Sequence, residues 1–404
     1  MRELKLKKDS FKFLEKGQTD FFHKEIDQSV SQFIPGEWVF IPHFSKNYSY
    51  VGMVNPFVDK SACLKIAGIV PSKKLEDKNE SEFSTEFVDD ALKKSIQRRQ
   101  RFKSSLCGAR LVYGSFDNLP GLIVDMYKDI ILVQISTAGL DRLREQIKAV
   151  LNQSFSNHKV YFFDNSNKRS LEGLPQYDNF EFEKLENIII EDAGIEYKLS
   201  RDIIQKNGYY FDHTPNRIKL ERAINELDIK FDNGLDLFSY CGSWGMHLLR
   251  SGLRKVSFVD QSPIVESIKE NVLRNSFDGA AQCVRSDVFK YLDECKQKQR
   301  KFDVIVSDPP AFSKGKDKKT SALRGYDSIH QKCVGLLNSP ALFAVGSCTK
   351  NVDFTDLDQS VKKAFKHHGK KAQMIEMGIQ GHDHPFRDFL DKGFYIKFIL
   401  YLVD

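Results

Sequence analysis

The sequence lacks the features that mark several large classes of protein. No stretch of its 404 residues approaches the roughly 18 consecutive apolar residues of a membrane-spanning helix. The N-terminus is charged and has no apolar segment behind it, unlike a signal peptide. The seven cysteines are an odd number without a CxxC pair, which argues against a disulfide framework and against a zinc site. These absences favour the reducing cytoplasm, no membrane partner and no metal.

Charge of one sign is only in mild excess. The 61 Lys and Arg residues exceed the 55 Asp and Glu residues, for a net charge of +6. Such a balance suits a polyanionic partner without requiring one. Every charged residue of the segment Lys93–Lys103 is a cation, which favours phosphate contact slightly over a solvated helix face. We expect Arg98 and Arg99 of this segment to contact the substrate.

The chain is too long for one ordinary domain, and its patterns change along its length. Residues 1–70 alternate short β-rich runs with turn signals, which suggests a small β-barrel. The polar stretch 71–86 is typical of a linker. Residues 87–192 combine strands with a helix, as a small α+β domain does. From 193 to 404 strands and helices alternate, which indicates a doubly wound α/β sheet.

The segment from Gly234 to Leu249 carries the strongest signal for a bound ligand. It has the pattern of a strand, a loop of small residues and the start of a helix. The small residues let a ligand approach the backbone, and N–H groups at the start of the helix face it. We expect contacts to a cofactor from the residues of this strand and loop that are listed here: Asp236, Phe238, Tyr240 and Gly242.

Acids also end the next two strands. Asp260 is placed to accept hydrogen bonds from ribose hydroxyls, and Asp287 lies where adenine is often recognised. Helix capping or surface solvation explains any one acid, but three at successive strand ends favour a ligand. The loop does not have the GxGxxG pattern of dinucleotide-binding sites, and the acidic Asp236 is poorly suited to bind a negatively charged pyrophosphate. S-adenosylmethionine carries a sulfonium and an ammonium but no phosphate, so the pattern favours this methyl donor over a dinucleotide.

A catalytic motif follows another apolar strand. Phe302–Ser307 runs into Asp308-Pro309-Pro310-Ala-Phe312. The prolines fix an extended turn, so the Asp308 carboxylate can face a planar base. Phe312 then offers a stacking surface. Methyltransferases that modify amino or ring positions of bases use such a motif.

Cys348 lies at the end of a later apolar strand. A small buried cysteine is the plain alternative. The functional interpretation is a thiolate that adds to C6 of cytosine, which makes C5 nucleophilic toward a methyl group. An unperturbed thiol has a pKa of about 8.5, so Lys350 or loop N–H groups would help it to ionise.

Together these segments resemble a known family. In order along the chain stand QKNGYYFDHTPNR (205–217), LDLFSYCGSWG, SDPPAF, ALRGY (322–326) and GSCTKNV. They resemble the bacterial and archaeal 23S rRNA cytosine-5 methyltransferases, over nearly the whole chain. The resemblance implies an α/β protein: a class I Rossmann-like methyltransferase domain preceded by a small PUA-like β-barrel and a small α+β domain. It also implies ribosomal RNA as partner and S-adenosylmethionine as cofactor.

The resemblance assigns roles by position. Cys348 corresponds to the nucleophile, Asp308 to the acid that orients the base beside the cofactor, and Asp212 to a residue that closes over the cofactor. His213 departs from the usual Gln of the family. The substrate-binding set then comprises Pro309, Pro310, Phe312, Arg98, Arg99 and Arg324.

Two alternatives stay open. A base methyltransferase that modifies an exocyclic amine or a purine ring nitrogen needs no cysteine, so Cys348 discriminates against it. An RNA-binding assembly factor with a degenerate catalytic domain is motivated by His213 and opposed by the intact Asp308 motif. The sequence leaves open the target nucleotide and whether the chain forms a homodimer.

Overall fold

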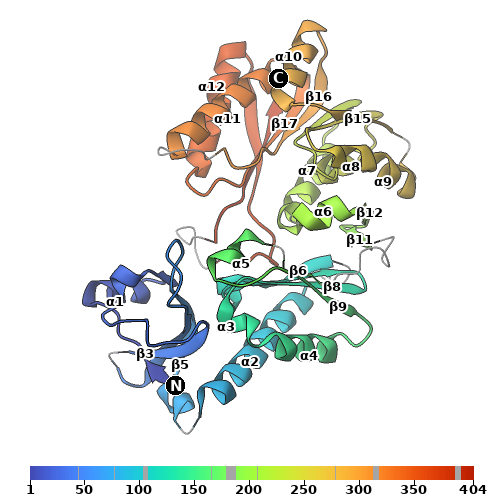
Figure 1. Ribbon diagram of the computed structural model, residues 1–404. Helices are drawn as coiled ribbons and strands as arrows, with labels where there is room; N and C mark the ends of the chain where they lie inside the picture. The colour runs from blue at the N-terminus through green and yellow to red at the C-terminus, as the bar shows by residue number, and fades with distance from the viewer. Residues whose placement is uncertain are drawn as a thin grey trace. The chain divides into compact units, whose positions relative to one another are not determined.

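The structure is a computed structural model that divides into two compact units, Met1–Glu186 and Asn187–Asp404. In Figure 1 the colour runs from blue at the N-terminus of the first unit to red at the C-terminus of the second. The residues described are 1–43, 45–76, 78–102, 108–164, 166–178, 188–206, 208–277, 279–312, 318–386 and 393–404.

The first unit contains two five-stranded sheets. One has the order β1-β3-β4-β5-β2 and is antiparallel except for the β1–β3 pair. The other has the order β10-β9-β8-β7-β6, with β8 and β9 parallel. The strands are β1 Arg2–Glu3, β2 Asp20–Phe21, β3 Glu37–Pro42, β4 Tyr48–Val54, β5 Leu64–Pro71, β6 Gly108–Tyr113, β7 Leu122–Tyr127, β8 Ile130–Ile135, β9 Lys159–Asp164 and β10 Tyr177–Asp178.

In the described part of this unit the α-helices are α1 Lys8–Glu15, α2 Glu80–Gln100, α3 Ala138–Asp141, α4 Arg144–Ser154 and α5 Asn167–Leu171. A capping box of Asn79 and Glu82 starts α2, because each side chain accepts the backbone N–H of the other. One hydrophobic core joins Trp38 of the first sheet, Leu92 of α2 and Val133 of the second sheet. The barrel-like and α+β segments expected separately therefore share a core.

The boundaries differ from those expected. The stretch 71–86, expected as a linker, ends β5, continues as a turn of 3-10 helix at Ser72–Leu75 and then enters α2. The capping box explains this, because it begins a helix inside a polar stretch whose composition is that of a loop. The chain divides into its two units between residues 186 and 187. The β11–β12 hairpin (Ile188–Asp192 and Ile195–Leu199) therefore belongs to the second unit.

The second unit is built on a seven-stranded sheet of order β15-β14-β13-β16-β17-β19-β18, which confirms the expected doubly wound α/β fold. Its strands are β13 Asn233–Leu237, β14 Lys255–Asp260, β15 Ala280–Arg285, β16 Phe302–Ser307, β17 Leu337–Ser347, β18 Ala372–Gly378 and β19 Lys397–Val403. Strands β13 to β17 are parallel, and β19 is antiparallel to its neighbours. The C-terminal strand β19 lies inside the sheet, between β17 and β18.

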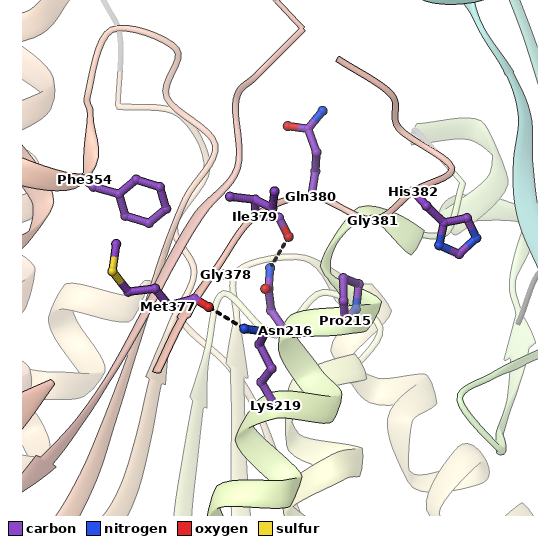
Figure 2. A pocket seen from close by; sticks show the side chains of 10 residues that line it. All are labelled: Pro215, Asn216, Lys219, Phe354, Met377, Gly378, Ile379, Gln380, Gly381 and His382. Carbon is purple, nitrogen blue, oxygen red and sulfur yellow. Dashed lines mark hydrogen bonds between the residues drawn. The ribbon is translucent and has the colours of Figure 1, made fainter. Parts of the chain in front are cut away.

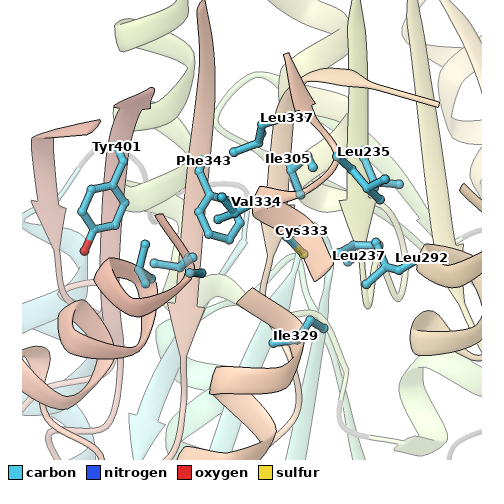
Figure 3. Close-up of a cluster of buried hydrophobic side chains, with 14 of the residues drawn as sticks. Leu235, Leu237, Leu292, Ile305, Ile329, Cys333, Val334, Leu337, Phe343 and Tyr401 are labelled. Carbon is cyan, nitrogen blue, oxygen red and sulfur yellow. The ribbon is translucent and has the colours of Figure 1, made fainter. Parts of the chain in front are cut away.

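Helices cover both faces of this sheet. They are α6 Arg201–Lys206, α7 Thr214–Glu226, α8 Ser243–Arg250, α9 Ile268–Arg274, α10 Val288–Gln297, α11 Lys318–Val334 and α12 Phe354–His368. Helices α10, α11 and α12 bury one core with the sheet; Figure 3 shows Ile329 and Cys333 of α11 against Ile305 and Phe343 of the strands. On the other face α8 packs closely: a Cβ on Gly245 would lie 2.2 Å from Phe258.

Within the described ranges, no helix has both the length and the apolar character that a membrane crossing requires.

Candidate active site

The parallel strands bring the expected polar residues to one edge of the sheet. Asp236 lies in β13, Asp260 ends β14, Asp287 follows β15, Asp308 follows β16 and Cys348 follows β17. Because these strands run in the same direction, their carboxyl ends share one edge. This edge is where ligands bind in open α/β sheets.

Asp236 is a buried carboxyl with one unused oxygen. It is fully buried, and its Oδ2 accepts the backbone N–H of Gly245 at the start of α8, at 2.9 Å. Oδ1 has no hydrogen-bond partner in the described structure. Burial raises the pKa of Asp236 to about 8, and the nearby carboxylates Asp308 and Asp260 add to this rise. A cation bound near this edge would favour the ionised form.

The loop between β13 and α8 has an unusual backbone. Phe238, Tyr240 and Gly242 have φ values of 59°, 50° and 83°. Two of these are bulky residues in the left-handed region, which costs free energy and is found mainly at functional sites. A Cβ on Gly242 would lie 3.0 Å from Ile268, so the position needs glycine for space as well.

Asp260 holds this loop in place. Its Oδ2 accepts the N–H of Tyr240 at 3.0 Å, and its Oδ1 accepts the N–H of Ser262 at 2.7 Å. Each carboxylate oxygen has a second lone pair, so both can still accept a hydroxyl. The Tyr240 hydroxyl donates to the carbonyls of Ile203 and Gly208, at 3.0 and 3.1 Å.

Asp287 has a structural role. It is exposed and is the N-cap of α10, where its Oδ1 accepts the N–H of Lys290 at 3.0 Å. Helix capping therefore accounts for this acid on its own. Adenine recognition by Asp287 stays a prediction.

Asp308 is held by an aromatic donor. Trp244 Nε1 donates to its Oδ2 at 3.0 Å, and the Trp244 ring stacks on Phe398 with centroids 5.4 Å apart. A Cβ on Gly346 would lie 2.5 Å from Asp308 Oδ1, so glycine makes room for the carboxylate. His213 Nε2 lies 3.6 Å from Oδ2, beyond hydrogen-bonding distance. The departure from the family pattern at His213 thus lies beside Asp308.

Cys348 stands close to the Asp308 motif. Its Sγ lies 3.9 Å from the carbonyl oxygen of Pro309, and the residue is half-buried. Burial raises the pKa of the Cys348 thiol to about 12; the carboxylates of Asp308 and Asp212 also raise it, and Lys397 lowers it. The thiol is therefore accessible but needs help to ionise.

The structure separates this cysteine from Cys241 of the cofactor loop. Cys241 is 1% exposed, and burial raises the pKa of its thiol to about 12 without giving it access to a substrate. Lys350, which the sequence suggested as an aid to ionisation, is exposed. The lysine whose charge lowers the pKa of Cys348 is Lys397 of β19. Sequence reasoning missed it because it lies far along the chain in an apolar strand.

Asp212 lies at the same edge, in a turn of 3-10 helix at Phe211–His213. Its Oδ2 accepts the Tyr395 hydroxyl at 2.6 Å, and its Oδ1 is without a partner in the described structure. Burial raises the pKa of Asp212, but His384, His213 and the hydrogen bond from Tyr395 together outweigh this and leave the pKa below its usual value. An ionised carboxylate is thus held near Cys348.

A pocket of about 500 Å³ is lined by residues of α7 and by residues at and after the end of β18 (Figure 2). Asn216 and Lys219 reach from α7 to the end of β18, where the Asn216 Nδ2 donates to the carbonyl of Ile379 at 3.1 Å. The same Nδ2 donates to His213 Nδ1 at 3.1 Å. This contact orients the His213 ring, whose Nε2 lies on the side of Asp308. Sequence reasoning did not single out Asn216, although it lies in the quoted motif TPNR.

Comparison with known proteins bears on this site. Ribosomal RNA large subunit methyltransferase I of Aliivibrio fischeri (strain ES114) is 32% identical over 301 residues, which is 73% of this chain and 74% of that protein. The chain belongs to this family. The same-named proteins of Aeromonas salmonicida and Vibrio cholerae are 31% and 29% identical, over 73% and 78% of this chain and 74% and 81% of theirs.

Two further comparisons concern a segment of the chain and its fold. Residues 201–341 match the family described as Conserved hypothetical protein 95. A solved structure described as a SAM-dependent methyltransferase from Streptococcus mutans is 18% identical, with a TM-score of 0.75 over 100% of both chains. At this identity the likeness concerns the fold, and it extends over both units.

The predicted substrate contacts of this family member fall into two groups. Near Asp308, Pro309 is buried, Pro310 is exposed and Arg324 is exposed on α11. The Phe312 ring packs edge-on against Tyr326 at 5.1 Å, so α11 holds the expected stacking surface on one side. Lys314 and Lys316, which follow the Asp308 motif in the sequence, lie outside the described residues.

The arginines predicted to bind phosphate lie on α2, in the first unit. Arg98 is partly exposed and pairs with Asp117 at 2.8 Å. Arg99 is fully buried and forms two hydrogen bonds with Asp117, at 2.6 and 2.8 Å. This burial contradicts the expected phosphate contact of Arg99, because its guanidinium is enclosed within the fold. Its place on the buried face of α2 is not visible in a run of cations.

Proposed function

We propose that this protein is an S-adenosylmethionine-dependent rRNA methyltransferase that forms 5-methylcytosine in 23S rRNA. The observation that carries the proposal is the position of a half-buried Cys348 thiol 3.9 Å from the Asp308 motif, at the carboxyl edge of the sheet. The names of the relatives support the rRNA substrate. The cytosine product rests on the chemistry of Cys348.

The residues at the strand ends fit the proposed cofactor. The carboxylates of Asp308 and Asp260 lie close enough to Asp236 to raise its pKa, in addition to the effect of burial. A ligand with two positive groups would stabilise all three carboxylates, and the unpartnered Asp236 Oδ1 can accept a hydrogen bond. A structural relative complexed with SAH supports this choice. When bound, S-adenosylmethionine supplies the methyl group; in this proposal Phe238, Tyr240 and Gly242 shape its loop.

Cys348 and Asp308 have different roles in the proposed reaction of the base. The Cys348 thiolate adds to C6 of cytosine, so that C5 becomes nucleophilic. After C5 is methylated, the C5 proton leaves to a base and the C6–S bond breaks, which restores the C5–C6 double bond and the thiolate. Asp308, held by Trp244, orients the ring. Pro310, Phe312 and Arg324 lie beside this motif or on α11, where we place the flanking RNA.

The first unit provides RNA contacts in this proposal. The sheet β1-β3-β4-β5-β2 serves as a PUA-like RNA-binding module, and the exposed cations of α2 contact phosphates.

A labelled-substrate experiment tests the proposal. The protein is incubated with S-adenosylmethionine and 23S rRNA containing 5-fluorocytidine, and covalent adducts are resolved on denaturing gels. Fluorine cannot leave C5 as a proton, so the wild type should stall as an adduct. Cys348→Ala should lose both adduct and methylation while S-adenosylmethionine still raises its melting temperature.

Cys241→Ala is the matched control, because Cys241 is buried in the cofactor loop rather than at the base site. It should keep the adduct. Near-normal methylation by Cys348→Ala would exclude the cytosine-C5 reaction. It would leave an amine-methylating enzyme, which uses the Asp308 motif without a cysteine.

A further inference from the structure

A buried lysine without an acidic partner lies next to the proposed nucleophile. Lys397, the first residue of β19, is 1% exposed. Burying an ammonium group is costly unless charge or hydrogen bonds compensate for it. Among the described residues, no carboxylate forms a salt bridge with it, so its place in the fold needs another explanation.

The contacts of Lys397 fix its position relative to Cys348. Its Nζ donates to the carbonyl oxygen of Thr349 at 2.7 Å and to that of Tyr395 at 2.9 Å. Thr349 follows Cys348 directly. In the antiparallel ladder of β17 and β19, Lys397 stands opposite Ser347, the residue before Cys348. The ammonium is therefore bound to the backbone turn that carries the thiol.

The charges around the pair are mainly negative. Asp308 and Asp212 face Cys348 from the β16 loop and from the turn at Phe211–His213, where His213 and His384 lie near Asp212. Lys397 has Asp353 and Asp356 at the start of α12 within electrostatic range. Asp356 pairs with Lys319 at 2.6 Å, so its charge is already balanced.

We propose that Lys397 is a positioning residue for the Cys348 nucleophile, whose buried ammonium supplies the positive charge opposite the thiolate. This inference rests on the proposed cytosine-C5 reaction. It explains why a lysine without a salt bridge is kept in an apolar strand, since the thiolate is its counter-ion in the reacting enzyme. The Lys397 ammonium otherwise contacts two backbone carbonyls and the Phe394 ring, whose centroid lies 5.8 Å from Nζ. The pKa values agree in direction: Lys397 lowers that of Cys348, while burial lowers that of Lys397 to about 8 and Cys348 raises it.

The test measures thiolate formation directly and needs neither RNA nor cofactor. Iodoacetamide alkylation of Cys348 is followed from about pH 6 to about pH 10, with peptide mass spectrometry to separate it from the other cysteines. Lys397→Met removes the charge and keeps the volume. Its alkylation profile should move up by about one pH unit, roughly a tenfold slower reaction at a given lower pH. Lys397→Arg, which keeps the charge, should move less.

Lys370→Met is the matched control. The Lys370 amine also donates to a backbone carbonyl, that of Asn338 at 3.1 Å, but at the opposite end of β17. Its Cys348 profile should equal that of the wild type. In methylation assays, Lys397→Met should lose kcat with little change in KM for RNA, and higher pH should restore part of the rate. A role confined to holding the backbone would not give this pH rescue.

An unchanged Cys348 profile in Lys397→Met overturns the inference and leaves the proposed function standing. Should that variant not fold, as judged by circular dichroism, Lys397→Gln keeps a donor for the Thr349 carbonyl and serves in the same assay. A wild-type Cys348 whose alkylation rate does not rise with pH across this range also overturns it. Methylation by Cys348→Ala, by contrast, overturns the proposed function itself.

Discussion

At the scale of single residues, the proposed site is a group of acids that burial and hydrogen bonds set to different tasks. Asp308 accepts from Trp244, Asp260 accepts two loop N–H groups, and Asp236 is enclosed with one oxygen unused. Asp287, which follows its strand as Asp308 does, caps a helix. The same residue type thus serves different roles because the surroundings of each strand end differ.

Asp236 should make stability depend on pH. Its pKa in the folded protein is about 8, far above that of an exposed aspartate, so the folded state binds the proton more tightly. Stability is therefore lost as pH rises toward 8. Asp236→Asn does not titrate, and between pH 6 and pH 8 it should gain about 2 kcal/mol relative to the wild type. Urea denaturation at each pH measures this difference.

Asp287→Asn is the comparison, because Asp287 is exposed and Asn caps helices as well as Asp does. Its stability should run parallel to that of the wild type. If the stability of Asp236→Asn also runs parallel to that of the wild type over this pH range, the Asp236 carboxyl is ionised in the folded protein and burial does not raise its pKa.

At the scale of elements, the β13–α8 loop combines strained backbone with close packing. Left-handed φ values at Phe238 and Tyr240 and the glycine at 242 form a tight turn between a buried strand and the helix that follows. The N–H of Gly245, at the start of that helix, is bound by Asp236. Strain of this kind persists only where the surrounding structure holds it, and here Asp260 and the Tyr240 hydroxyl do so.

Two glycines allow the strain and the packing to be separated. Gly242 and Gly252 have φ values of 83° and 91°, but a Cβ would meet Ile268 at 3.0 Å only at Gly242, with nothing within 4 Å at Gly252. Both alanine variants should lose about 1–3 kcal/mol through the backbone. Gly242→Ala should lose more in urea denaturation, and it should also weaken the thermal shift by S-adenosylmethionine. Equal losses would mean that the contact with Ile268 relaxes without cost.

At the scale of the whole molecule, the two units carry separate cores and separate parts of the proposed function. The chemistry-bearing residues lie in Asn187–Asp404, and the basic helix α2 lies in Met1–Glu186. The net charge of +6 suits an RNA partner for the chain as a whole. Burial of Arg99 shows that only part of the basic segment is available for phosphates.

RNA binding should weaken with salt in proportion to the phosphate contacts. For single-stranded RNA, log affinity falls against log salt with a slope near 0.7 per contact. Replacing the exposed Arg98 and Arg101 by Gln should reduce the slope by about 1.4 at most. A comparison variant replaces Lys93 and Lys94, whose pairs with Asp89 and Asp90 on the same helix compete with phosphate, and it should reduce the slope less. Filter binding over a salt series measures the slope for each variant. An unchanged slope in the arginine variant would mean that these side chains of α2 contact solvent rather than phosphate.

Much of the fold could be predicted because its signals are local. The apolar run Phe302–Ser307 is a strand buried in a parallel sheet, and such strands show continuous apolar residues. The residues that follow each strand could be placed at one edge, since parallel strands end together. Asp236, Asp260, Asp308 and Cys348 were found in this way.

The tertiary structure alone decided the remaining features, because they depend on pairs of residues distant in sequence. The pairing of β17 with β19 places Lys397 beside Cys348, and no local pattern encodes that register. Packing of α2 on the second sheet of the first unit buries Arg99, although a run of cations suggests exposure. Local sequence thus determined which chemical groups stand at the strand ends. Long-range packing set their charge state and their access to solvent, since both depend on burial and on neighbours from other elements.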